Sequence, residues 1–411
     1  MPIKWKSSDR FKPSHILDRI DSVRSVNDEG QVSYSGLVID EYIPILHSML
    51  QFPPIAVGME QEMLVWKALN LSGKELTPDT FLNLINQVLS EKLTTKEQNY
   101  IVLTTISLIP DGLINKIKFM GCEIEFQPKS FPKKFIEPRK EVIKKYKADI
   151  PETPSSYCHV IIKIRAKSDN IAFHKAMRAL DLIRAIMCLM ANSRMQYSFG
   201  TPLLEPINKI RLGGYHTVHL MDGMSARKGY WYEPNFITTK PHAFDNPTLA
   251  RKNILWAIKK IENSKFENSI TSSLLRFVRG LDQNDHNSAF LKLWSALEIL
   301  TTPNVADYDK LIRRSSFLFK DNAYHRQVLE HLRAYRNANV HAGEDSENAR
   351  IYCFQLQTYY AAIAWFCIRN ESSFKTLEDL GLFLDLPIEQ RTLNAQLKSI
   401  KRAIKFFSPL K

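Results

Sequence analysis

The sequence predicts an α+β protein, with an N-terminal mixed α/β-sheet domain over residues 1–240 and a C-terminal all-α helical bundle over residues 241–411. Two patterns predict this division. Strand-like alternation of apolar and polar residues is confined to the part before residue 247, and beyond it apolar residues recur with helical spacing. A polar segment at 233–250 with three prolines lies between them, and we place the domain boundary there.

The first recognisable element of the N-terminal part is a helix. Thr77 and Pro78 precede an apolar run with helical spacing, which is typical of a capped helix with proline at its first position. Residues 118–126 and 160–165 alternate in polarity and are expected to be strands. Residues 99–109 are apolar and β-branched, so either a buried strand or a helix fits them.

A second helix and a strand-like region complete this part. Asp169 is placed to cap an amphipathic helix that extends to about residue 192. Residues 194–220 return to a strand-like pattern, interrupted by turn signals at Gly200 to Pro202 and at Gly213 to Gly214.

The C-terminal part is expected to contain only helices. Helical periodicity is found over residues 249–261, 270–278, 289–300, 308–318, 325–340 and 349–368, and a basic amphipathic helix is expected over residues 393–407. We expect this last helix to pack on the bundle, contact RNA or lie on a membrane surface.

Composition restricts the class of protein. A content of 44% apolar residues excludes global disorder, and no apolar run approaches the roughly 18 residues of a membrane span. The N-terminus lacks the apolar segment of a secretion signal, and the five cysteines form no C-x-x-C pair, so we expect a reducing cytoplasm. The net charge of +13 favours a polyanionic partner, such as RNA, DNA or anionic lipid.

The segment from His331 to Gly343 contains the strongest candidate for a catalytic site. On a helix, Arg333, Asn337 and His341 form a polar stripe flanked by Arg336, beside the apolar face that would pack in the bundle. Gly343 is placed to end the helix. His341 would then lie in the last turn, where the negative end of the helix dipole favours its protonated form.

The spacing of the Arg336 and His341 pair is not specific by itself. Arg326 and His331 share the same separation in the same helix, and Arg211 and His216 share it around two glycines. The third pair is distinguished by its context, which consists of an asparagine after the arginine, a glycine stop and an upstream amphipathic helix containing Trp294.

This combination resembles the HEPN superfamily, whose helical bundles contain an arginine and a histidine separated by four to six residues. Residues 285–370 are most similar to the ApeA-like branch, which is known for prokaryotic antiviral defence. The resemblance implies a HEPN bundle in which Arg336 and His341 are the active pair and Asn337 assists them. It also implies a candidate third member, Glu298, for which a solvent-facing or capping role is the alternative.

The resemblance implies a metal-independent endoribonuclease without a cofactor. Histidine suits proton transfer at the 2′-hydroxyl, and the arginine fork suits the charge on the phosphate oxygens. The expected ends are a 2′,3′-cyclic phosphate and a 5′-OH. Family members commonly pool two copies of the pair, which implies a homodimer. The implied setting is abortive infection, with cleavage of host RNA such as tRNA after a phage-encoded trigger.

Basic residues elsewhere are candidates for holding RNA. The segment 129–147 interleaves eight basic residues with aromatic ones, as phosphate and base contacts require. The RNA-binding candidates are Arg333, Lys133, Lys134, Arg139 and Lys140. The alternative function is a non-catalytic HEPN module that binds RNA or a protein partner. His216 and His219 would point to opposite faces of a strand, so no metal site is expected there.

Overall fold

The computed structural model describes residues 2–56, 59–127, 129–145, 151, 153–192, 195, 206–305, 307–343, 345–370 and 373–408, with the side chains of 341 and 342 excepted. Helices and strands both occur, so the α+β class is confirmed at that level. The chain forms two compact units. The first comprises Met1–Val102, Lys163–Ala176 and Val218–Arg227, and the second comprises Leu103–Ile162, Met177–Thr217 and Lys228–Lys411.

The first unit is built mainly from helices with short strands between them. Its N-terminal elements are β1 (Lys4–Trp5), α1 (Pro13–Ser22), β2 (Arg24–Val26), β3 (Val32–Tyr34), α2 (Ile39–Ser48), β4 (Leu50–Gln51), α3 (Gln61–Asn70) and α4 (Pro78–Thr94). The expected capped helix is α4, in which Thr77 accepts a hydrogen bond from the Thr80 backbone. A core of buried hydrophobic residues, including Leu17, Ile43 and Phe81, holds these helices together.

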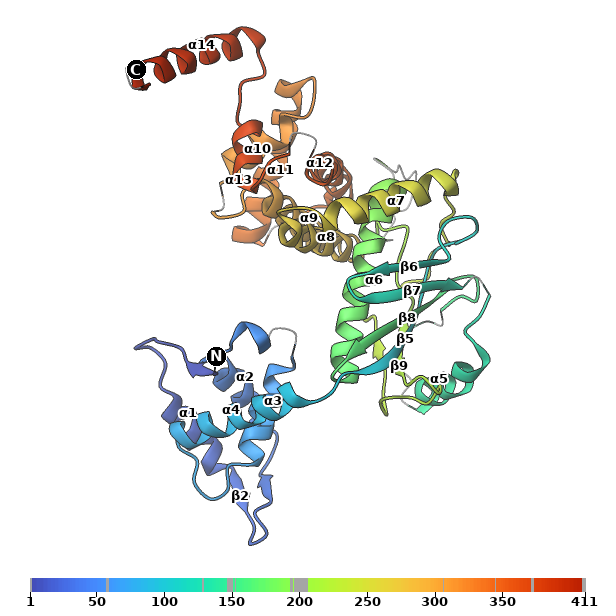
Figure 1. Ribbon diagram of the computed structural model, residues 1–411, viewed down its shortest axis with the longest axis vertical. Coiled ribbons are helices and arrows are strands. Elements are labelled where there is room, and N and C mark those ends of the chain that lie inside the picture. Colours follow the sequence, from blue (N-terminus) through green and yellow to red (C-terminus); the bar gives the residue numbers. More distant parts are fainter. Residues whose placement is uncertain are drawn as a thin grey trace. The chain divides into compact units, whose positions relative to one another are not determined.

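Strands from the middle of the chain form a six-stranded sheet in the order β10-β9-β5-β8-β7-β6. The strands are β5 (Gln98–Ile106), β6 (Lys116–Phe119), β7 (Cys122–Gln127), β8 (Cys158–Ala166), β9 (Tyr215–His219) and β10 (Trp231–Tyr232). The ambiguous segment 99–109 is therefore mainly a buried strand. Helix α6 (Asp169–Ala191) lies on one side of the sheet and α5 (Lys133–Lys145) on the other (Figure 1).

Two expectations for the sheet region need correction or restriction. Residues 118–126 are not one strand, because β6 and β7 form an antiparallel hairpin in which Phe119 pairs with Cys122. Met120 and Gly121 both have positive φ, as a two-residue hairpin turn requires. The turn signal expected at Gly200 to Pro202 lies outside the described residues.

The helices of the C-terminal part match the expected segments closely. They are α7 (Pro247–Glu262), α8 (Glu267–Leu281), α9 (His286–Thr301), α10 (Tyr308–Ser316), α11 (Asn322–Ala342), α12 (Ala349–Arg369), α13 (Leu377–Leu384) and α14 (Gln390–Phe407). Helix α13 was not expected. Helix α9 packs against both α8 and α12 at the centre of this bundle. No described helix is long and apolar enough to cross a bilayer.

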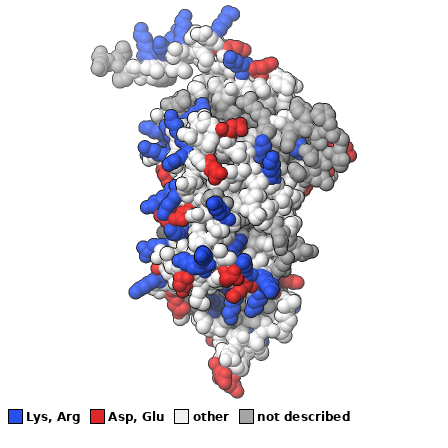
Figure 2. Space-filling model, turned by 90° about the vertical axis from the view of Figure 1, so that its right-hand side faces the viewer, with Lys and Arg blue, Asp and Glu red and all other residues white. Residues whose placement is uncertain are grey.

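Helix α14 buries none of its residues. In Figure 2 it is the helix at the top of the view, and Lys and Arg side chains project from it. The packing of this helix on the bundle, one of its three expected roles, is therefore absent from the described structure. Its apolar residues Leu397, Ile400 and Ile404 are at least half exposed.

The second unit joins part of the sheet and α6 to the helical bundle. A buried ion network provides a physical reason, because Arg184 on α6 pairs with Asp282 after α8. Asp181 on α6 in turn pairs with Arg279 on α8. Charges that lie far apart in sequence thus hold the sheet region and the bundle together.

Candidate active site

The candidate active residues lie on α9 and α11, with α10 contributing to their surroundings. Helix α11 buries Leu329 and Leu332 completely, which confirms the expected apolar face. Gly343 ends the helix in the left-handed conformation, with φ of 67°, and its N–H donates to the carbonyl of Asn339. The glycine stop is therefore confirmed, and the backbone of His341 lies in the last helical turn.

Arg336 is held by an aromatic ring and a neighbouring amide. Its guanidinium carbon lies 4.9 Å from the centre of the Tyr308 ring, a cation–π distance. One of its nitrogens donates to Asn337 Oδ1 at 3.4 Å, which is a long hydrogen bond. Both contacts orient the arginine without neutralising its charge. Arg336 and Asn337 are each partly exposed.

Glu298 shares the electrostatic environment of Arg336. Trp294, one turn earlier on α9, donates its indole N–H to Glu298 Oε1 at 3.1 Å. Burial raises the pKa of Glu298, and the charges of Arg336 and Arg276 offset only part of that increase. The carboxylate is thus retained in a place where its charge is disfavoured, which is common at functional sites.

Arg333 is less available than its position on the polar stripe implied. It pairs with Asp309 Oδ1 at 2.6 Å and with Glu330 Oε2 at 3.5 Å. Its guanidinium carbon also lies 5.9 Å from the centre of the Tyr308 ring. Any phosphate contact by Arg333 would therefore compete with two carboxylates.

The side chain of His341 lies outside the described residues. Its distance to Arg336 and its protonation state therefore remain predictions from helical geometry. The other two arginine–histidine pairs with the same spacing lie in different environments. The His331 ring packs against Tyr352, and Arg211 and His216 are both buried in the sheet region.

The residues around α11 that sequence reasoning missed are a tyrosine, an arginine and an asparagine. Tyr308 forms the base under two arginines, and Arg276 on α8 adds a second positive charge near Glu298. Asn287 accepts hydrogen bonds from the hydroxyl of Tyr335 and from the N–H of Ser346. The aromatic residue at the start of a predicted helix was the one usable signal for Tyr308.

The α5 candidates divide into exposed and inward-facing residues. Lys133, Lys134 and Lys140 are exposed, and Lys140 pairs with Glu137 at 2.9 Å. Arg139 instead points into the sheet region, donating to Thr217 Oγ1 at 2.6 Å and to the carbonyl of Tyr215 at 2.8 Å. Arg139 therefore anchors α5, so an RNA contact at this position requires an approach to a partly buried group.

The histidines of β9 each contact an oxygen atom. His216 contacts Glu233 Oε1 at 3.2 Å, and His219 contacts the carbonyl of Gly223 at 3.0 Å. Among the described residues, no group of three His, Cys, Asp or Glu side chains is arranged to hold a metal ion.

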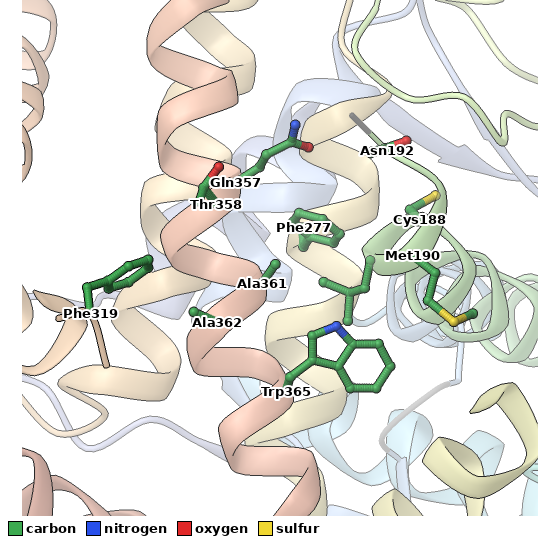
Figure 3. A pocket seen from close by; sticks show the side chains of 11 residues that line it. Cys188, Met190, Asn192, Phe277, Phe319, Gln357, Thr358, Ala361, Ala362 and Trp365 are labelled. Atoms are coloured by element: carbon green, nitrogen blue, oxygen red, sulfur yellow. The ribbon is translucent and has the colours of Figure 1, made fainter. Parts of the chain in front are cut away.

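A cavity of about 390 Å³ among α6, α8 and α12 offers a contrasting environment. Figure 3 shows Phe277 and Trp365 facing it, with Gln357 and Thr358 as polar members. None of its described lining residues carries a formal charge, so the residues shown do not provide a match for a phosphodiester.

Comparisons with known proteins add no assignment. No family model, no curated protein and no solved structure matches the chain.

Proposed function

We propose that the protein is a metal-independent endoribonuclease of the HEPN type, with Arg336 and His341 as its active pair. The observation that carries the proposal is the state of Arg336, which is oriented by Tyr308 and Asn337 and keeps its charge available. This group lies on the same helix as His341, which occupies the last turn before Gly343. A guanidinium presented in this way suits the charge that develops on a phosphate in the transition state.

The proposed reaction uses the nucleophile that RNA carries. The 2′-hydroxyl attacks phosphorus as its proton passes to a base, the bond from phosphorus to the 5′-oxygen breaks, and that oxygen receives a proton. His341 serves the proton transfers, and Arg336 stabilises the charged phosphorane. The products are a 2′,3′-cyclic phosphate and a 5′-OH. In this proposal Glu298, which interacts electrostatically with Arg336, adjusts the field around it.

A homodimer forms part of the proposal for a geometric reason. On an α-helix, residues five apart are separated by about 7.5 Å along the axis and about 140° around it. Arg336 and His341 of one helix therefore diverge, and a second copy related by a twofold axis supplies groups that converge on one phosphate. The proposed role is the cleavage of host RNA, with tRNA as a candidate, during cytoplasmic antiphage defence triggered by a phage component.

The test compares purified full-length variants on total RNA in the absence of divalent metal. Arg336→Ala and His341→Ala should each lower cleavage by about 10² to 10⁴, the usual contribution of such groups. Arg326→Ala and His331→Ala are matched controls, since they remove the same residue types at the same spacing in α11. These controls should cleave like the parent chain.

Cells that co-express a phage library provide the activated state if the purified protein is silent. Sequencing of RNA ends should then reveal new 5′-OH ends that depend on Arg336 and His341. Defence that persists in both variants would reject the nuclease and favour the alternative, a non-catalytic HEPN module that binds RNA or a protein partner.

A further inference from the structure

Helix α5 borders a cavity of about 860 Å³ in the second unit. This volume lies in the range of small-molecule binding sites and is far larger than an inorganic ion requires. The described lining residues are Thr105, Phe131, Glu137, Arg139, Lys140, Glu141, Ile143, Lys144, Thr153, Pro154, Ser155, His159 and Tyr215.

Arg139 gives this cavity a positive charge without a carboxylate partner among its hydrogen bonds. Its acceptors are the carbonyls of Leu103 at 3.3 Å and Tyr215 at 2.8 Å and the hydroxyl of Thr217 at 2.6 Å. These three bonds leave two of the five guanidinium donors for other partners. Burial lowers the pKa of Arg139 to about 10, as expected for a cation removed from water.

Two other polar atoms in the lining lack a hydrogen-bond partner although they are buried. They are Nδ1 of His159 and Oγ1 of Thr105. Burial, together with the charge of Arg139, lowers the pKa of His159, so its imidazole is neutral at pH 7 and each ring nitrogen serves as either a donor or an acceptor. Buried polar atoms without a hydrogen-bond partner are uncommon in protein cores, and a bound ligand is one way in which such atoms are satisfied.

The rim adds charges and hydroxyl groups that suit a phosphate. Lys144 and Ser155 are exposed there, and Lys140 lies beside them in its pair with Glu137. A second carboxylate, Glu141, also lines the cavity. Three cations against two carboxylates leave a surplus of one positive charge. The apolar part of the lining, mainly Phe131, Ile143 and Pro154, would contact the uncharged portion of a ligand.

We propose that this cavity binds a small organic phosphate of nucleotide size, with its phosphate at Arg139 and Lys144. The proposal is independent of RNA cleavage at α11. It also separates the two ends of α5, because Lys133 and Lys134 lie at the start of the helix and are absent from the described lining, whereas Lys144 lies near its end. A ligand held in the cavity is sensitive to Lys144 and insensitive to Lys133, whereas RNA lying along the helix depends on both.

The experiment measures binding of inorganic phosphate, AMP and ATP to the full-length protein by calorimetry. At least one nucleotide should bind more tightly than inorganic phosphate, because the cavity accommodates the nucleoside as well. Lys144→Glu should weaken that binding by about tenfold or more, the effect of losing one strong charged contact. Lys133→Glu is the matched control, with the same charge change on the same helix, and should stay within about twofold.

Arg139→Met would test the central contact, but Arg139 also anchors α5, so the exposed Lys144 variant provides the decisive comparison. Absence of binding by all three probes would overturn the proposal. Equal weakening by Lys133→Glu and Lys144→Glu would do so too, because it would indicate a diffuse charged surface. Displacement of AMP by an RNA oligomer without terminal phosphates would assign the site to RNA instead.

Discussion

Two clusters of arginine and carboxylate side chains in the second unit differ in how completely their charges are paired. Around Arg184, which is fully buried, the guanidinium bonds to Asp181 at 2.6 Å and to both oxygens of Asp282 at 2.8 and 2.9 Å. Around Arg336, a ring and an amide replace the carboxylates as contacts. Arg184 forms ion pairs with carboxylates inside the protein, whereas Arg336 forms no ion pair with a described carboxylate.

The buried cluster extends into the sheet through the same kind of pairing. Arg279 bonds to Asp181 at 2.7 Å and to both oxygens of Glu233 at 3.0 Å. Although burial opposes ionisation, the contacts with His216 and Arg279 lower the pKa of Glu233. Burial lowers the pKa of His216, so the neutral ring donates from Nε2 to Glu233 and accepts from Thr104 at Nδ1. Charged groups that are paired so completely within the protein have a structural role.

The largest expected effect follows from removing the central buried arginine. Arg184→Met should lower the free energy of unfolding by about 3 to 5 kcal/mol, because Asp181 and Asp282 each lose a buried ion-pair partner. Arg336→Met is the matched variant and should change the free energy by less than about 1 kcal/mol, the scale of an exposed cation–π contact. Urea unfolding followed by circular dichroism measures both. Similar losses in the two variants would remove the distinction between the clusters.

An intermediate effect is expected at a glycine that packs against another saturated arginine. A Cβ atom on Gly381 would lie 2.6 Å from a guanidinium nitrogen of Arg314. That guanidinium ends a long side chain, yet it is fixed by Asp385 at 2.6 Å and by the carbonyl of Thr301. Gly381→Ala should therefore cost about 1 to 3 kcal/mol.

The control for this glycine is Gly229→Ala, since nothing lies within 4 Å of its added Cβ atom. It should be nearly neutral by thermal unfolding. A tolerated alanine at both positions would show that Arg314 can move, and that its pairing is less rigid than that of Arg184.

The smallest expected effect concerns Glu298 and has the opposite sign. Its pKa is raised in the folded protein, so the folded state binds the proton more tightly than the unfolded state does. Stability contributed by Glu298 therefore falls as pH rises from the ordinary value of 4.5 through the raised one. Glu298→Gln should gain less than about 1 kcal/mol at pH 7 and lose this advantage below pH 4.

The same variant separates stability from activity. If Glu298 assists Arg336, Glu298→Gln should cleave RNA more slowly while unfolding at a higher urea concentration. Stabilisation without a loss of cleavage would place Glu298 outside the active site. The bond from Trp294 should survive the change, because the glutamine side chain still offers an oxygen.

Local signals made much of the fold predictable. Thr77 with Pro78 marked the start of α4, and Gly343 marked the end of α11, because each fixes backbone geometry within a few residues. The hairpin at Met120 was missed because its non-glycine residue adopts a positive φ, which the sequence does not announce. Helix α13 was missed because it has only eight residues, among them Gly381.

Long-range partners explain most of what the sequence concealed. Asp181 and Arg279 are 98 residues apart, and no periodicity connects them. The prediction of a domain boundary near residue 240 rests on local composition, which contains no information about such long-range pairs. The candidate site could be predicted from the sequence only in part. Helical spacing predicted that Arg336 and Asn337 lie next to the packed face, whereas the environment of Glu298 came from the packing of α9 against its neighbours.

The amide of Asn287 connects α9 to α11 and to the segment that follows it. A single oxygen accepts from Tyr335 in the middle of α11 and from Ser346 beyond its end, so it links both residues to the first turn of α9. Because Tyr335 and Ser346 share this acceptor, a displacement of Ser346 would also change the hydrogen bond that holds α11, the helix that contains Arg336.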